Sequence, residues 1–196
     1  MNKLIVLFLL LSFSLLGGSN LIKDDKMKKF EKYWYFGKKT EFKYVTPEIR
    51  KGEFKISTKH SSEPTYMALR TAVKIKYKQS YKLTFEAKME GEGQMQLRAQ
   101  VGYDNYDGKR SKAKRLNNTI IQGLGKIYKP EDGEWKKITC HFTVDKETPR
   151  AYISEIVYRL GAFEGDITLR NFDLVLAKDE KKEKNGSMQV SNLSDK

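Results

Sequence analysis

The sequence predicts an all-β protein, folded as an antiparallel β-sandwich or barrel. Apolar and polar residues alternate along most of the 196-residue chain, as they do in strands that bury one face and expose the other. The alternating segments are short, and turns that carry Gly, Asp or Pro separate them. One segment, residues 21–36, fits a short helix or a lead-in strand equally well, and little else in the chain is helical.

The predicted strands follow one another closely along the chain. In chain order they are residues 53–57, 66–75, 81–89, 95–103, 135–144, 151–160 and 166–176. Within residues 81–89, for example, Leu83 and Phe85 share an apolar face, and Thr84 and Glu86 lie opposite. We expect the sequence EGEG at residues 90–93 to connect two of these strands.

Residues 151–160 fit two phases of alternation. One phase turns Glu155 and Arg159 outward and turns four residues inward: Tyr152, Ile156, Tyr158 and Leu160. The opposite phase buries Glu155, and the burial of a lone carboxylate is costly. We therefore predict that Glu155 and Arg159 lie on the outer face of their sheet.

The two ends of the chain read differently from its middle. Residues 1–19 resemble a signal peptide, with a positive Lys3, an apolar run at 4–16 and small residues before the predicted cleavage near Ser19. The run of about 13 residues is shorter than the roughly 20 needed to span a bilayer. We expect an exported protein without a membrane span after cleavage, a folded domain over residues 24–177, and a disordered polar tail over 178–196.

Charge and cysteine content narrow the choice of partners. The formal net charge of +13 attracts anions such as acidic glycans, anionic envelope polymers or nucleic acid. The other interpretation is a Lys-rich surface that is simply solvated. Export argues against nucleic acid as the natural ligand. A lone Cys140 cannot form an internal disulfide, and we expect it to be a small buried hydrophobic residue.

Four motifs, in this order, resemble one known family. They are FEKYWYF, YKLTFEAKMEG, GEWKKITCHFTV and GDITLRNFDLVL. Together they resemble the carbohydrate-binding modules of the galactose-binding-like jelly-roll class, the group of families 4, 9, 16 and 22, from about Phe30 to Leu176. The resemblance implies a jelly-roll sandwich that binds sugars without chemistry, in a cleft lined by the outward residues of one sheet. It also makes Trp135 a framework residue.

The resemblance implies a structural calcium ion, which this sequence does not favour. In the family, an Asp on the closing strand helps an early Glu to hold the ion. Here Glu31 matches the early Glu, and Arg170 occupies the Asp position. Calcium needs carboxylate and carbonyl oxygens, and a guanidinium repels it. We expect no calcium at this place and no other cofactor, with Arg170 paired to an acid instead.

An unusual row of polar residues is the main candidate binding surface. Gln96, Arg98 and Gln100 alternate along residues 95–103, on the face opposite the apolar one. Amide side chains donate and accept hydrogen bonds as sugar hydroxyls do, and a guanidinium offers a planar fork to hydroxyls or a carboxylate. The other interpretation is an ordinary wet face. The resemblance adds Arg70, Glu155 and Arg159 to the predicted site.

Aromatic residues complete the predicted site, because flat rings stack on the C–H face of a pyranose. Tyr106 lies in a predicted loop, residues 101–110, where its ring would be accessible. Trp34 is either a core residue or a second platform, and we include it among the candidate ligand-binding residues.

These observations favour an exported, non-catalytic protein that binds a polysaccharide or oligosaccharide, with acidic glycans among the candidates. It would act beside a separate glycoside hydrolase or hold polysaccharide at the cell surface. One alternative is a structural or adhesive envelope protein that kept the sandwich without a sugar site. Another is a jelly-roll polysaccharide lyase that uses Arg98, Gln100, His141 and a Tyr. No paired carboxylates, nucleophile motif or metal-ligand cluster supports catalysis.

Overall fold

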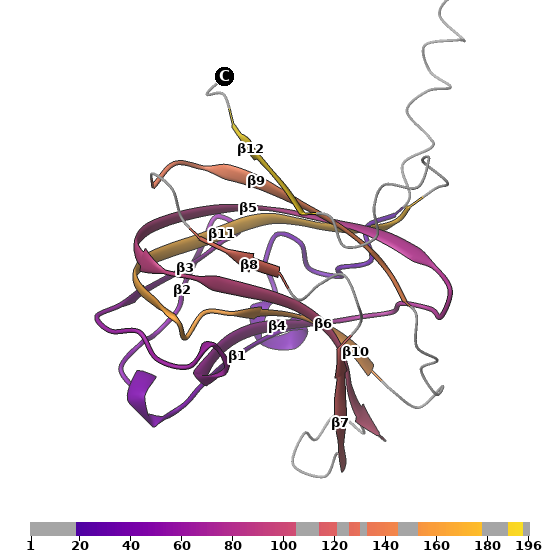
Figure 1. Ribbon diagram of the computed structural model, residues 1–196, viewed down its shortest axis with the longest axis horizontal. Coiled ribbons are helices and arrows are strands. Elements are labelled where there is room, and N and C mark those ends of the chain that lie inside the picture. The colour runs from indigo at the N-terminus through magenta and orange to yellow at the C-terminus, as the bar shows by residue number, and fades with distance from the viewer. Residues whose placement is uncertain are drawn as a thin grey trace, which may run out of the picture.

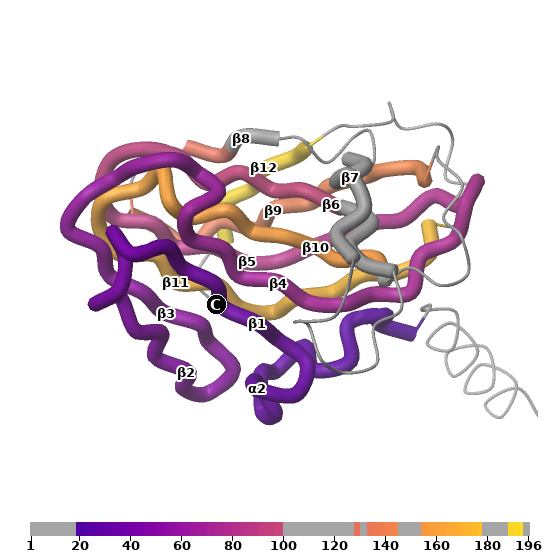
Figure 2. The backbone as a smooth tube through the Cα atoms, turned by 90° about the horizontal axis from the view of Figure 1, so that it is seen from below, coloured from indigo at the N-terminus to yellow at the C-terminus, as the bar shows by residue number. Residues whose placement is uncertain are grey.

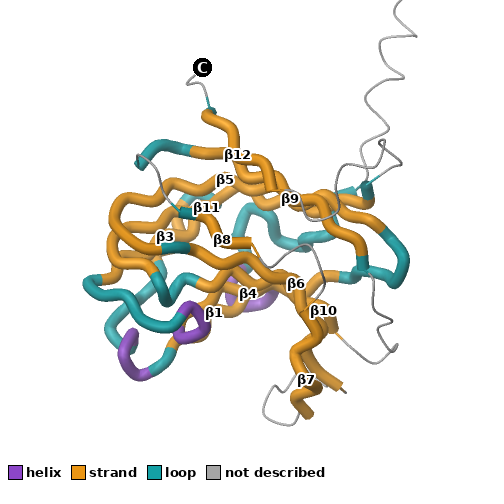
Figure 3. Tube along the Cα trace, viewed as in Figure 1, coloured by secondary structure: helices purple, strands orange, loops and turns teal. Residues whose placement is uncertain are grey.

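A computed structural model describes residues 19–104, 114–120, 126–129, 133–144, 153–177 and 188–193, and strands dominate it (Figure 1). Two antiparallel sheets pack face to face, which confirms the predicted all-β sandwich. Helical structure in these ranges consists of α2 (Phe30–Tyr33) and two 3-10 turns, drawn in purple in Figure 3. Within the same ranges, no helix is long and apolar enough to cross a membrane.

The first sheet, called sheet A, carries most of the predicted site. Its strand order is β1-β4-β10-β6-β7, and β8 pairs with another part of β6. The strands are β1 (Trp34–Lys38), β4 (Met67–Val73), β10 (Ile153–Arg159), β6 (Met95–Asp104), β7 (Lys114–Ile120) and β8 (Lys126–Tyr128).

The second sheet, called sheet B, forms the other layer, with the order β12-β9-β5-β11-β3-β2. The strands are β12 (Met188–Asn192), β9 (Lys136–Thr143), β5 (Ser80–Gly93), β11 (Phe163–Leu176), β3 (Glu53–Thr58) and β2 (Glu48–Arg50). Successive strands from β3 to β6, and again from β9 to β11, alternate between the two sheets. This repeated crossing is the jelly-roll arrangement.

Alternation along each strand builds the core between the sheets. On β5, five inward residues are all buried: Tyr81, Leu83, Phe85, Ala87 and Met89. From sheet A, Tyr158 meets the ring of Phe85 edge-on at 5.1 Å and the ring of Phe172 at 5.4 Å. Aromatic pairs in this geometry add stability beyond their buried area. Cys140 is buried, as predicted.

The EGEG sequence is part of strand β5 rather than a separate connection. Gly91 pairs with Gly165 of β11, and both have positive φ angles, +141° and +128°. A β-carbon on either glycine would collide with the backbone of the opposite strand. The glycine pair therefore lets β5 and β11 approach closely where β5 ends, and Gln94 alone separates β5 from β6.

Both interpretations of residues 21–36 are partly correct, because the helix α2 leads directly into the strand β1. The loop before α2 is held by Asp24, whose carboxylate accepts hydrogen bonds from the backbone N–H groups of Lys28 and Lys29 at 2.9 and 2.8 Å. The indole Nε1 of Trp34 donates to the carbonyl oxygen of Asp24 at 2.8 Å.

The prediction that residues 178–196 are disordered is wrong for β12. This strand pairs antiparallel with β9, from Met188 opposite Cys140 to Asn192 opposite Lys136. The Nζ of Lys136 also donates to the Oδ1 of Asn192 at 2.7 Å. An edge strand is held by backbone hydrogen bonds, which a polar sequence can make as well as an apolar one. Low apolar content was therefore a poor guide here.

Arg170 is held on sheet B by two carboxylates and a ring. Its Nε donates to the Oε2 of Glu86 at 2.8 Å, and its Nη1 donates to the Oε1 of Glu53 at 2.9 Å. The guanidinium carbon lies 3.7 Å from the centre of the Trp135 ring. Arg170 thus pairs with acids as predicted, although Glu31 is not one of these two. A cation occupies the space between these carboxylates, so the residues present do not fit a calcium ion.

We expect Arg170→Met to lower the free energy of unfolding by about 2–3 kcal/mol, because it leaves two carboxylates without their shared partner. Urea unfolding followed by fluorescence measures the change. The control is Lys55→Met, since Lys55 makes a 3.9 Å ion pair with Asp166 in which both side chains are about half exposed. Its effect should stay below about 1 kcal/mol. Equal effects of the two substitutions would contradict the structural role of Arg170.

Candidate functional site

The outer face of sheet A gathers three arginines around one valine. In β10, Val157 pairs with Arg70 of β4 on one side and with Arg98 of β6 on the other. Arg159 lies two residues along β10 and pairs with Gln96. Paired residues in neighbouring strands point to the same face of the sheet. We call this set, with Glu155, the arginine face; Figure 2 views the molecule from this side, with β4, β10 and β6 next to one another.

The outward phase of β10 follows from its inward residues. Ile156, Tyr158 and Leu160 belong to the core cluster, so Glu155, Val157 and Arg159 point the other way. This confirms the predicted phase for the described residues; Tyr152 lies outside them. Glu155 is nevertheless only 3% exposed, so its outward direction does not keep the carboxylate in water.

A basic partner offsets the burial of Glu155. The Nη1 of Arg70 lies 3.7 Å from the Oε2 of Glu155. An ion pair of this kind makes a buried carboxylate tolerable, whereas removal of one partner is strongly destabilising. The face therefore depends on the pairing of β4 with β10, which brings the two side chains together.

The arginines lie close enough to repel one another. Burial, followed by the positive charges of Arg98 and Arg70, lowers the pKa of Arg159 to about 10. The Nη1 of Arg159 donates to the Oε1 of Gln96 at 3.2 Å, so this contact adds no negative charge. The buried Nε atoms of Arg70 and Arg98 have no hydrogen-bond acceptor within the described part of the chain. The face therefore holds concentrated positive charge and unused donors.

Tyr35 is a face residue that sequence reasoning missed. It pairs with Arg70 across β1 and β4, and 43% of its surface is exposed. Its ring lies over Gly37, where an added β-carbon would be 2.8 Å from the Cε1 atom of Tyr35. The missing side chain lets the ring lie along the sheet. Alternation along β1 could have predicted this position, because neighbouring residues of a strand point to opposite faces and Trp34 is buried.

The structure separates the predicted site residues into three groups. Those brought together on the arginine face are Arg70, Gln96, Arg98, Glu155 and Arg159. The backbone of Gln100 lies opposite Glu155 in β6, but its side chain is outside the described features, and Tyr106 lies outside the described residues. The prediction of Trp34 as a binding platform is wrong, because its ring is 4% exposed and packs 4.8 Å from Phe172 in the core.

The residues proposed for a lyase do not meet. His141 lies on β9 of sheet B, between the buried residues Cys140 and Phe142, so it points to the outer face of that sheet. Arg98 lies on the outer face of sheet A, on the other side of the core. The second histidine, His60, stacks on Phe42 at 4.7 Å. His141 therefore cannot act together with Arg98.

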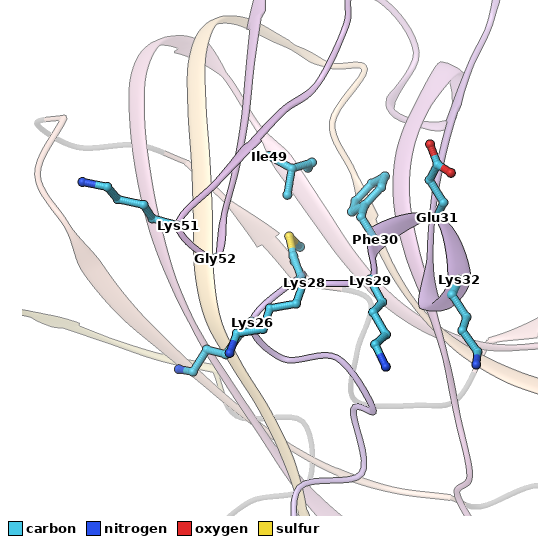
Figure 4. Close-up of a pocket in the computed structure, with 10 residues that line it drawn as sticks. Lys26, Lys28, Lys29, Phe30, Glu31, Lys32, Ile49, Lys51 and Gly52 are labelled. Atoms are coloured by element: carbon cyan, nitrogen blue, oxygen red, sulfur yellow. The ribbon is translucent and has the colours of Figure 1, made fainter.

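A pocket lies beside α2 (Figure 4). This pocket of about 1050 Å³ has an apolar floor of Met27, Phe30 and Ile49. Its other lining residues are Lys26, Lys28, Lys29, Glu31, Lys32, Lys51 and Gly52. The lysines are exposed. Figure 4 shows the side chains of Lys29 and Lys32 pointing downward, away from the apolar floor, and that of Lys51 pointing to the left. The pocket is positive at its rim but holds no converging set of donors.

Comparison with protein-family models and with curated proteins finds no match. Solved structures do match. A carbohydrate-binding module described as CBM4 aligns at a TM-score of 0.56 and 10% identity, over 80% of this chain and 99% of that one. The N-terminal cellulose-binding domain of Cellulomonas fimi β-1,4-glucanase C aligns at 0.51 and 15% identity, over 74% and 90% of the two chains.

One enzyme also shares the architecture. The enzymatically active domain of tailspike protein 4 of bacteriophage CBA120 aligns at a TM-score of 0.51 and 14% identity, over 81% of this chain but only 21% of that one. Identities this low show the fold alone. The chain therefore has the jelly-roll fold found in carbohydrate-binding modules, as the sequence motifs predicted.

We expect Glu155→Gln to lower the free energy of unfolding by about 3 kcal/mol, because it removes the buried carboxylate that pairs with Arg70. Chemical denaturation measures the change, and Asp166→Asn, in the exposed pair with Lys55, is the matched control. Adding Arg98→Gln to the Glu155→Gln protein should recover part of the loss, since it relieves repulsion. Additive losses in the double variant would show that the arginines do not interact.

Proposed function

We propose that this protein binds a polysaccharide or oligosaccharide on the outer face of sheet A and does no chemistry on it. The observation that carries the proposal is the combination, on one outward face of this fold, of an accessible aromatic ring with a row of arginine and amide side chains. Tyr35 supplies the ring, and Gln96 and Arg98 belong to the row. The carbohydrate-binding modules with the same fold support a sugar as the ligand.

The chemistry of the face suits a sugar. Hydroxyl groups donate and accept hydrogen bonds, and the guanidinium and amide groups offer both kinds of partner. The exposed ring of Tyr35 offers a flat apolar surface to the C–H side of a pyranose, while its position over Gly37 keeps the ring close to the sheet. Net contacts of this kind contribute about 1 kcal/mol each, so we expect dissociation constants from micromolar to millimolar.

A role outside the cell, beside a separate glycan-degrading enzyme or at the cell surface, is part of the proposal. It rests on the leader-like sequence at residues 1–19. A purely binding role is supported by the placement of His141 and Arg98 on opposite outer faces. An envelope protein with no sugar site is the competing outcome, and it predicts no glycan binding at all.

A glycan array probed with the full chain tests the proposal, and titration calorimetry then measures the affinity for each hit. Tyr35→Ala should weaken binding at least tenfold, because it removes the stacking surface. Tyr44→Ala is the matched control, since Tyr44 is 84% exposed and lies outside the strands of both sheets. Circular dichroism confirms that both variants fold.

A folded protein that binds no glycan on the array would overturn the proposed function. Equal weakening by Tyr35→Ala and Tyr44→Ala would place the site elsewhere on the surface.

A further inference from the structure

We propose that the glycan is acidic and that Arg70, Arg98 and Arg159 together bind its carboxylate or sulfate group. This inference rests on the proposed function and adds the chemical class of the ligand. The outward residues of known placement on β4, β10 and β6 include these three arginines and one acid, Glu155. One negative charge thus stands among three positive ones, on a surface where several of the side chains are largely shielded from water.

Because these side chains are largely buried from water, the excess of positive charge is poorly screened. Val157, between Arg70 and Arg98, has no exposed surface, and Arg159 is 9% exposed. Water screens repulsion poorly in such a place, so like charges raise the free energy of the unliganded protein. An anion that enters the cluster relieves this repulsion, which favours binding of an acidic ligand over a neutral one.

Unused donors point the same way. The Nε atoms of Arg70 and Arg98 are buried and find no acceptor among the described residues. A guanidinium presents Nε–H and Nη–H as a planar fork that matches the two oxygens of a carboxylate or two oxygens of a sulfate. Arg70 and Arg98 flank Val157 from opposite sides, so an anion above Val157 would have a guanidinium on either side.

The same protein shows what an arginine with a structural role looks like. Arg170 donates to both Glu86 and Glu53 and lies against the Trp135 ring, so its charge is compensated twice. On sheet A, by contrast, Arg70 pairs with Glu155, Arg159 bonds to the neutral Gln96, and the positive charges of Arg98 and Arg70 act on Arg159. An arrangement that costs stability without a ligand is typical of a binding site rather than of a scaffold.

The ring of Tyr35 and the arginines lie in one row across the sheet, so that a single oligosaccharide could contact both. It pairs directly with Arg70, and Arg70 is followed in the same row by Val157 and Arg98. Neighbouring strands lie about 4.8 Å apart. A pyranose stacked on Tyr35 therefore brings the acidic group of that sugar, or of the next one, over the arginines.

The experiment compares oligogalacturonate with the same oligosaccharide after methyl esterification, which removes the charge and keeps the sugar. A carrageenan oligosaccharide, which carries sulfate and no carboxylate, and cellohexaose form the sulfated and neutral arms. Calorimetry at 150 mM salt uses the full chain, its Arg98→Gln variant and its Arg50→Gln variant. Arg50 is exposed on β2 of sheet B, so this control loses the same charge far from the arginine face.

We expect an acidic oligosaccharide to bind at least tenfold more tightly than its neutral counterpart. Arg98→Gln should abolish that preference, and Arg50→Gln should leave it unchanged. Preference for the galacturonate or for the sulfated ligand identifies carboxylate or sulfate as the recognised group. The melting temperature supplies an independent readout, because Arg98→Gln should leave it unchanged or raise it, whereas loss of a structural arginine would lower it.

The outcomes separate the two proposals. Tight binding of cellohexaose and of the methyl ester, with no gain from charge, would overturn the acidic specificity and leave the sugar-binding function standing. Equal loss of acidic binding in Arg98→Gln and Arg50→Gln would show that general surface charge, not the arginine cluster, attracts the ligand, and this also overturns the inference. No binding in any arm would overturn the proposed function itself.

Discussion

The structure of the candidate site depends on the position of β10 between β4 and β6. A strand paired on both sides has no freedom of register, because a shift by one residue would turn its core residues outward. Ile156 and Tyr158 therefore determine where Val157 points, and the two ladders determine that Arg70 and Arg98 flank it. The packing of the core and the geometry of the outer face are two consequences of one register.

Alternation in the sequence predicted which residues point outward, but it did not predict that the arginines lie close together. It indicated correctly that Arg70, Gln96, Arg98 and Arg159 point outward, because the neighbours of each belong to the inward phase of the alternation. Their proximity is a matter of strand order, which alternation does not contain. Only the resemblance to a jelly-roll family suggested a shared sheet, and nothing in the sequence indicated that Arg70 would pair with Glu155 or that Arg98 and Arg70 would lie close enough to Arg159 to repel it.

The errors have physical causes of the same kind. The sequence leaves open whether Trp34 is a core residue or a platform, because residues 21–36 fit a helix and a strand equally well. The structure settles the phase through long-range contacts, with the indole bonded to Asp24 and packed on Phe172. Strand β12 was missed because backbone pairing at a sheet edge leaves little trace in composition. Local patterns cannot report interactions whose partners lie far away in the chain.

The two arginine environments have opposite effects on the stability of the fold. On sheet B, Arg170 joins β11 to β5 and β3 through Glu86 and Glu53. On sheet A, the positive charges of the clustered arginines repel one another, and this repulsion lowers the stability of the fold. A domain without disulfides can tolerate that repulsion only if the core offsets it. The aromatic contacts of Tyr158 with Phe85 and Phe172 lie directly beneath the arginine face, where such compensation is needed. A cluster of aromatic core residues and the arginine face are thus the two sides of β10.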